Sequence, residues 1–263
     1  MKLRSGIKDG HLIHLEHEDI LNGFQENYAY EIIRLINARP LFLDLHYERL
    51  EKSCITLQID PPKKERIEKD IKVLVKHNQI ANNNLKIAID QSNYAIYPIP
   101  SKYPGIDDYS KGVHCALLYE ERDNPEIKAF QSDLRAKSNK QISQEKVYES
   151  VLVNDEGKIT EGSRSNLFFI KDATIITAPD HLVLGGITRL KVLEICNALH
   201  LDIYFKAIAV EELRNMDAAF ICGTSPGVLP ISFIENESFN AQYSTLCKIH
   251  NSYHSKYLSK PEL

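Results

Sequence analysis

The sequence of 263 residues has no long apolar run. Its longest runs have the length of a β-strand, so we expect no transmembrane helix. It also lacks an excess of charge of one sign, since 32 Lys and Arg residues are interspersed with 36 Asp and Glu residues. A net charge of −4 gives no reason to expect a nucleic acid or a membrane as partner. Lys2 and Arg4 are followed by no apolar stretch, so we expect no signal peptide.

Cysteine is scarce, and its five copies are far apart, with no two at the spacing of metal ligands. Four of them stand among apolar neighbours: Cys54, Cys115, Cys196 and Cys222. A free thiol in such surroundings behaves as a small hydrophobic group, and this usage predicts a reducing cytoplasm. The histidines are scattered too. The closest approach to a metal cluster is His11, His14 and His17, which we interpret as surface or core residues, and we predict no metal site.

The sequence does contain an alternation of strand and helix patterns. In its first half, runs rich in β-branched and aromatic residues predict strands at 28–36, 40–43, 85–89, 95–99 and 115–119. One helix is expected to begin at Asp44 as its N-cap, and another after Pro61-Pro62. The pair Asn124-Pro125 is a turn signal in a polar stretch. We therefore predict an α+β protein with a first domain at 1–119, a linker at 120–126 and a second domain at 127–263.

The second half continues the alternation. We expect a polar helix over 127–144, a second helix over 187–199 and an amphipathic helix within 239–258. Strands are expected at 147–153, 167–170, 174–177, 202–207 and 218–222. Asp155-Glu156-Gly157 predicts a hairpin turn.

Three motifs carry most of the functional information. They are Ile159-Thr160-Glu161-Gly162-Ser163-Arg164-Ser165-Asn166, Gly185-Gly186-Ile187-Thr188-Arg189 and Gly223-Thr224-Ser225-Pro226. A carboxylate, a glycine-led helix start and a glycine-hydroxyl turn, in that order, suit a pocket for a charged, phosphorylated cofactor. Together the motifs resemble those of the class IV aminotransferases, and the resemblance covers about residues 27–231.

That resemblance implies a two-domain fold of type IV, like that of the D-amino acid aminotransferases, with pyridoxal 5'-phosphate bound between the domains. It also implies a homodimer whose partner chain contributes a loop to each pocket. The cofactor supplies the organic chemistry, while the protein positions and tunes it. The substrates implied are an amino acid and a 2-oxo acid.

A cofactor of this kind needs a lysine for the internal aldimine and for moving protons. Lys128 follows Asn124-Pro125 and stands 33 residues before Glu161. The family's lysine follows a similar Asn-Pro approach at a similar distance from its acid, so the resemblance assigns the catalytic role to Lys128. Lys137 is only 24 residues before Glu161 and is interpreted, like Lys140, as part of the exposed face of a polar helix.

The remaining cofactor contacts follow from the other motifs. A carboxylate beside a pyridinium nitrogen stabilises the charged form, and the resemblance puts Glu161 there. A helix N-terminus presents unpaired N–H groups to an anion, which makes the start of the 187–199 helix the candidate for the phosphate. A guanidinium group also suits a phosphate. The full set of expected cofactor-binding residues is Arg49, Glu161, Ser165, Asn166, Gly186, Ile187, Thr188, Thr224 and Ser225.

Substrate recognition transfers less well. The tyrosine that branched-chain aminotransferases place five residues after the lysine is Asp133 here, and Ser92–Pro98 lacks the Arg-x-His element of the D-amino acid enzymes. Tyr30, Tyr94 and Tyr97 are the candidates for the substrate side of the pocket, and each is also explained as core or surface.

The resemblance therefore predicts transfer of an amino group between an amino acid and a 2-oxo acid through a Lys128 aldimine. The alternative is an aminodeoxychorismate lyase, which releases 4-aminobenzoate and pyruvate with the same lysine and acid. A third reading is a non-catalytic relative that keeps the fold.

Overall fold

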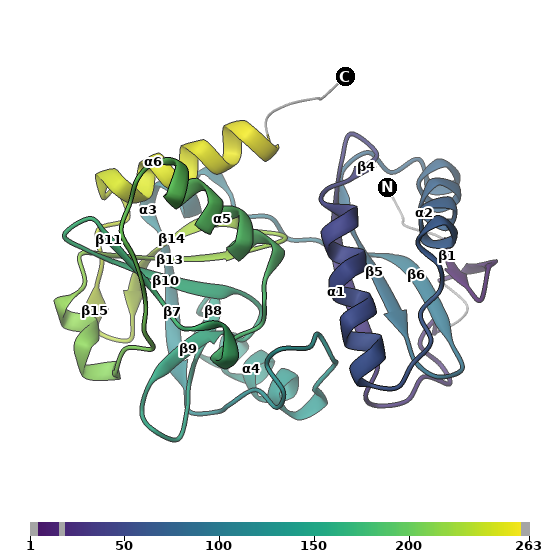
Figure 1. The fold of residues 1–263 in the computed structure, drawn as a ribbon, viewed down its shortest axis with the longest axis horizontal. Coiled ribbons are helices and arrows are strands. Elements are labelled where there is room, and N and C mark those ends of the chain that lie inside the picture. The colour runs from purple at the N-terminus through teal and green to yellow at the C-terminus, as the bar shows by residue number, and fades with distance from the viewer. Residues whose placement is uncertain (1–4, 16–18, 259–263) are drawn as a thin grey trace. The chain divides into compact units, whose positions relative to one another are not determined.

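The structure is a computed structural model that describes residues 5–15 and 19–258 (Figure 1). His17, considered above as part of a metal cluster, lies outside the described residues. The chain forms two compact units. Among the described residues, the first unit contains those up to Lys102 together with Ile127–Gln131, and the second contains Tyr103–Glu126 and those from Ser132 onward.

The first unit is built on an antiparallel sheet with the strand order β2-β1-β6-β5-β3-β4. Its strands are β1 (Ser5–Lys8), β2 (His11–His14), β3 (Ala29–Ile36), β4 (Arg39–Pro40), β5 (Asn83–Ile89) and β6 (Tyr94–Ile99). In the register of the central strands, Ile32 of β3 lies opposite Lys86 of β5, and Lys86 lies opposite Tyr97 of β6. Because successive side chains of a strand point to opposite faces, this register divides the sheet into two chemically different faces.

Two helices cover one face of this sheet: α1 (Leu43–Thr56) and α2 (Lys64–Asn78) (Figure 1). Leu50 of α1 and Ile71 of α2 pack with Ile33 and Leu85 of the strands in one hydrophobic core. The expected N-cap Asp44 is one residue inside α1, because the helix starts at Leu43 after Phe42 in a left-handed conformation. An acidic side chain in the first turn still favours the helix through its dipole.

The second unit is built on a mixed sheet with the main path β12-β11-β10-β13-β14-β7-β8-β9, and β15 pairs with β14. Its strands are β7 (Val113–Leu118), β8 (Glu149–Val153), β9 (Ile159–Gly162), β10 (Asn166–Lys171), β11 (Thr174–Thr177), β12 (Ile203–Phe205), β13 (Ala218–Gly223), β14 (Gly227–Ile234) and β15 (Glu237–Ser238). The central strands are buried along nearly their whole length, and because successive side chains point to opposite faces, they build a core on each face of the sheet.

The helices of the second unit are α3 (Ile106–Lys111), α4 (Ser132–Glu145), α5 (Ile187–Ala198) and α6 (Ser244–Tyr253), with shorter turns η1 (Asp180–Leu182), η2 (Val210–Asn215) and η3 (His254–Leu258). α5 and α6 lie side by side (Figure 1) and pack on Phe168 and Phe220 of the sheet. In the part of the chain that the structure describes, no helix has the length and apolar character needed to cross a membrane.

The observed division differs from the predicted boundaries in two places. β7, expected in the first domain, pairs in parallel with β14 and β8 and belongs to the second unit. Ile127–Gln131, expected to open the second domain, returns to the first unit, where Ala129 bridges to Ala29. Pairing between residues far apart in the chain leaves no trace in local composition. The turn signal at 120–126 therefore marks one of several crossings between the units.

Candidate functional site

Lys128 is held by its main chain in the first unit. Its N–H donates to Ser53 Oγ of α1 at 3.0 Å, and its carbonyl accepts from the N–H of Tyr30 at 3.1 Å. The Phe130 N–H donates to the Tyr28 carbonyl at 3.0 Å, so the segment extends the sheet beside the start of β3. The Lys128 Nζ lies 4.7 Å from the centre of the Tyr30 ring. The structure thus brings together two predicted residues, Lys128 and Tyr30, and fixes the backbone of both.

Arg49 is oriented by a buried acid on the helix-covered face of the same unit. Its Nε donates to Glu31 Oε1 and its Nη2 to Glu31 Oε2, each at 2.7 Å. His46 Nδ1 contacts Glu31 Oε2 at 2.7 Å, and Glu31 is fully buried. His46 and Arg49 are three residues apart on α1 and therefore share a helix face. A paired, bidentate guanidinium is pre-organised, because most of its rotamers are already excluded.

This cluster is strongly ionic. Burial acts to raise the pKa of Glu31, but the charges of Arg49 and His46 and their hydrogen bonds outweigh it and lower the pKa from 4.5 to about 2. Burial lowers the pKa of His46, and the nearby charges of Arg49 and Lys128 act in the same direction, against the pull of Glu31. Glu31 is therefore a fixed anion that holds Arg49 in place.

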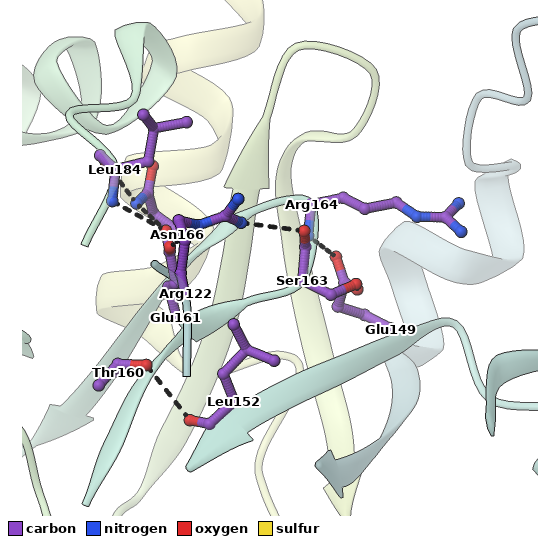
Figure 2. Close-up of polar contacts among 9 residues, drawn as sticks. All are labelled: Arg122, Glu149, Leu152, Thr160, Glu161, Ser163, Arg164, Asn166 and Leu184. Atoms are coloured by element: carbon purple, nitrogen blue, oxygen red, sulfur yellow. Dashed lines mark hydrogen bonds and ion pairs between the residues drawn. The ribbon is translucent and has the colours of Figure 1, made fainter. Parts of the chain in front are cut away.

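Glu161 is the buried acid of the second unit, at the end of β9 (Figure 2). Its Oε1 accepts from Arg122 Nε at 2.7 Å, and its Oε2 accepts from Asn166 Nδ2 at 3.2 Å and from the Leu184 N–H at 3.1 Å. Arg122 Nη2 also donates to the Ser163 carbonyl at 3.1 Å. All three donors act on the carboxyl oxygens of Glu161, and a carboxylate keeps acceptor capacity beyond three bonds.

The loop after β9 is organised by a second buried acid, Glu149 of β8 (Figure 2). Its Oε1 accepts from Ser163 Oγ at 2.7 Å, while its Oε2 accepts from Ser165 Oγ at 2.9 Å and from the Arg164 N–H at 3.2 Å. The hydroxyl of Ser165, expected to contact the cofactor, is thus directed at Glu149. This hydrogen bond stabilises the loop that follows Glu161.

The start of α5 lies against Glu161. Asn166 Nδ2 donates to the Leu184 carbonyl at 2.8 Å as well as to Glu161. Gly186 is the N-cap residue of α5, and a Cβ placed on it would stand 2.0 Å from Asn166 Oδ1. Only a residue without a side chain fits there. Ile187 and Thr188 follow as the first, buried residues of the helix, whose unpaired N–H groups attract an anion.

The third motif forms the turn between β13 and β14. Gly223 pairs with Gly227, so Thr224 and Ser225 lie in the connecting turn, where both are partly exposed. β13 is also the direct neighbour of β10, with Cys222 opposite Asn166. The sheet therefore places the turn beside the start of β10, next to the residue that links Glu161 to α5.

The three candidate substrate tyrosines do not share one environment. Tyr30 belongs to a cluster with Tyr28 and partly buried Phe130. Tyr97 lies opposite Lys86, and the pKa of Tyr97 is raised by burial and by the proximity of Tyr28. Tyr94 instead packs in the core under α2. Burial and Asp70 of that helix raise the pKa of Tyr94. We therefore leave Tyr94 out of the proposed substrate side and retain Tyr30 and Tyr97.

Three charged residues near the candidate site residues were not predicted from the sequence: Lys86, Arg122 and Glu149. Arg122 stands 39 residues before Glu161, in a stretch interpreted as a polar linker. Glu149 lies in a predicted strand, where an isolated acid in a strand pattern was a weak but available signal of a buried partner. Lys86 is one strand away from Tyr30, and only the register shows that they share a face.

Comparison with known proteins identifies a family for this chain. The family model described as Amino-transferase class IV matches residues 28–234. A D-alanine aminotransferase from Bacillus licheniformis is 28% identical over 230 residues, which cover 81% of this chain and 81% of the relative.

Two solved structures have the same fold. The branched-chain aminotransferase from the archaeon Thermoproteus uzoniensis with norvaline has a TM-score of 0.84 at 24% identity, covering 99% of this chain and 97% of that one. A T.th. branched-chain amino acid aminotransferase with pyridoxamine 5'-phosphate has a TM-score of 0.86 at 20% identity, covering 99% of this chain and 96% of that one.

Proposed function

The chain belongs to the class IV aminotransferase family, and from this we propose that it transfers an amino group between an amino acid and a 2-oxo acid with pyridoxal 5'-phosphate. Enzymes of the family use this cofactor, which when bound acts as an electron sink for the bonds at the substrate's α-carbon. The observation that carries the proposal is the link between Glu161 and the start of α5 through Asn166.

The residues present fit the cofactor in charge and in shape. Glu161 is a buried acid whose two carboxyl oxygens accept from Arg122 and from the Leu184 N–H, and a carboxylate is the partner that a pyridinium nitrogen needs. The N-cap Gly186 makes no side-chain hydrogen bond to α5, so the N–H groups of the first turn have no side-chain cap and suit an anion. We assign Glu161 to the ring nitrogen, with Asn166 beside it, and the phosphate to Gly186, Ile187 and Thr188, with Thr224 and Ser225.

In the first unit, Lys128 is the proposed catalytic residue. Its amine would hold the cofactor covalently and would move the proton at the substrate's α-carbon. The hydrogen bonds at its N–H and carbonyl fix where the side chain starts, and the Tyr30 ring bounds the space that the amine occupies. Arg49, held by Glu31, is the proposed further phosphate ligand of this unit.

The proposal is tested with the absorbance spectrum of the protein loaded with pyridoxal 5'-phosphate, before and after addition of L- and D-amino acids. We expect a visible band that converts to the spectrum of pyridoxamine phosphate and returns when a 2-oxo acid is added. Lys128→Ala should abolish the visible band and lower turnover by about 10²- to 10⁴-fold. The exposed Lys140 provides the control variant Lys140→Ala, which should behave as the wild type.

Two results would contradict the proposal. A Lys128→Ala variant with full turnover would remove the assignment of the lysine. A wild-type protein that forms the band, reacts with no amino acid and releases pyruvate from aminodeoxychorismate would establish the lyase reaction instead.

A further inference from the structure

Lys86 projects from the centre of the first unit's sheet, on the face opposite to the helices. It lies opposite Ile32 of β3 and Tyr97 of β6, and its side chain is partly buried. Its Nζ donates to the Tyr28 hydroxyl at 2.6 Å. The same nitrogen lies 4.7 Å from the ring centre of Tyr28, 5.1 Å from that of Tyr30 and 5.2 Å from that of Phe130.

These three rings form an ordered aromatic cluster. Tyr28 stacks on Phe130 with ring centres 5.1 Å apart and planes at 8°, and Tyr30 meets both edge-on. The cluster fixes the direction of the Lys86 stem and replaces part of the water around its ammonium. A charge with less water around it pairs more strongly with an opposite charge than one in bulk solvent does.

Lys86 and Lys128 share the Tyr30 ring. The Lys128 Nζ lies 4.7 Å and the Lys86 Nζ 5.1 Å from the centre of that ring. The two nitrogens are therefore separated by no more than the sum of these distances. An α-amino acid carries its amine and its carboxylate on one carbon. A cation that binds the carboxylate must lie close to the lysine with which the amine exchanges.

We propose that Lys86, oriented by Tyr28, binds the α-carboxylate of the amino acid substrate. The inference rests on the proposed function, because it assumes that the substrate amine reacts where Lys128 does. Lys86 would supply the positive charge that Ser92–Pro98, without an Arg-x-His element, does not. An ammonium and a phenol hydroxyl give the carboxylate two donors, because Tyr28 can rotate its proton towards it.

A purely structural role for Lys86 makes a different prediction. If the ammonium only completes the packing of the aromatic cluster, its removal changes stability and affects substrates with and without a carboxylate equally. If it binds the carboxylate, its removal affects only ligands that carry one. The readout is thus the dependence on the carboxylate, measured separately from folding and from cofactor binding.

The experiment compares Lys86→Met and Lys86→Arg with the wild type, all loaded with pyridoxal 5'-phosphate. Lys72 is an exposed lysine on α2, whose packed side covers the other face of the sheet, and Lys72→Met is the matched control. Butyrate, which cannot react, is titrated into each protein while the cofactor band is monitored. The half-reaction is then measured with both enantiomers of alanine and leucine and with the corresponding amines, ethylamine and 3-methylbutylamine.

We expect all four proteins to bind the cofactor equally. Lys86→Met should bind butyrate and the reactive amino acid roughly 10- to 100-fold more weakly, as expected for the loss of a charge-assisted hydrogen bond, with no change for the amines. Lys86→Arg should keep most of the wild-type affinity for butyrate, and Lys72→Met should keep all of it. Tyr28→Phe, which keeps the ring and removes the hydroxyl, should weaken butyrate binding by a smaller factor than Lys86→Met does.

Unchanged butyrate affinity in Lys86→Met overturns the inference, and so does an equal loss for amino acids and amines. If Lys86→Met does not fold, two results together overturn the inference. Tyr28→Phe would bind butyrate with unchanged affinity, and the wild type would react better with the amines than with the amino acids. These results leave the proposed function intact, because the wild-type band still converts with amino acids. A wild-type protein that forms no band removes the proposed function, and the inference with it.

Discussion

At the scale of single residues, the acids beside the proposed site residues are buried and paired with donors. Glu31 holds Arg49, and Glu161 is held by Arg122, Asn166 and the Leu184 N–H. Removing one member of such a pair leaves an uncompensated charge in the interior, which costs about 3–5 kcal/mol. Burial of these acids therefore requires the pairing, and the same hydrogen bonds also fix the orientation of the side chains.

The first prediction concerns Glu31 and pH. Its pKa is lowered from 4.5 to about 2, so its contribution to stability is complete above pH 4.5 and is lost as the pH falls towards 2. The shift corresponds to about 3 kcal/mol. In Glu31→Gln the free energy of unfolding should be lower at pH 7, and this deficit should shrink by about 3 kcal/mol between pH 7 and pH 2. Urea unfolding at several pH values measures it.

Glu48, exposed on the same helix α1, provides the control for that series. Glu48→Gln should follow the wild type at every pH. Parallel pH profiles for wild type and Glu31→Gln would show that Glu31 is not the ionised centre of the cluster.

At the scale of elements, the proposed phosphate site depends on how closely α5 approaches the sheet. Leu184, which precedes α5, bonds to Glu161 and Asn166, and a side chain at Gly186 would displace the buried Asn166. The start of the helix is thus fixed by β9 and β10, and not by a side-chain cap, which α5 does not have. Backbone N–H groups left without a cap are the ones that an anion can use.

The two adjacent glycines before α5 give the second prediction. In Gly186→Ala the new Cβ would meet Asn166 Oδ1 at 2.0 Å, whereas a Cβ at Gly185 would meet nothing within 4 Å. Gly186→Ala should therefore destabilise the protein by about 1–3 kcal/mol and weaken pyridoxal phosphate binding, while Gly185→Ala should do neither. Thermal unfolding and equilibrium dialysis of the cofactor measure both effects. Equal behaviour of the two variants would remove Asn166 as the link between the acid and the helix.

The sequence predicted the elements around this site more reliably than the contacts between them. The strands on either side of Glu161, at 147–153 and 167–170, and the helix that begins at Ile187 follow from local residue patterns, whereas strand β9, which carries Glu161, was not predicted. Arg122 could not be assigned in the same way, because its partner lies 39 residues further along the chain and the pairing depends on tertiary structure. For the same reason Lys86 was overlooked and Tyr94 was included: the register of β5 and β6, not the residue type, decides which face a side chain occupies.

At the scale of the whole molecule, the chain passes between its two units more than once. The segment Ile127–Gln131 belongs to the first unit, although the residues on either side of it belong to the second. The predicted boundary at 120–126 missed this return, since the pairing of Ala129 with Ala29 joins positions 100 residues apart. The return is what puts Lys128 beside Tyr30 and α1, so the connection between the units carries the residue on which the proposed reaction depends.

The most direct test of the proposed chemistry is to identify the residue to which the cofactor is bound. The protein is loaded with pyridoxal 5'-phosphate, reduced with borohydride, digested and analysed by peptide mass spectrometry. We predict a stable phosphopyridoxyl label on Lys128 and none on Lys86 or Lys140. A label on Lys86, or the absence of any labelled lysine in a protein that binds the cofactor, would contradict the assignment of Lys128.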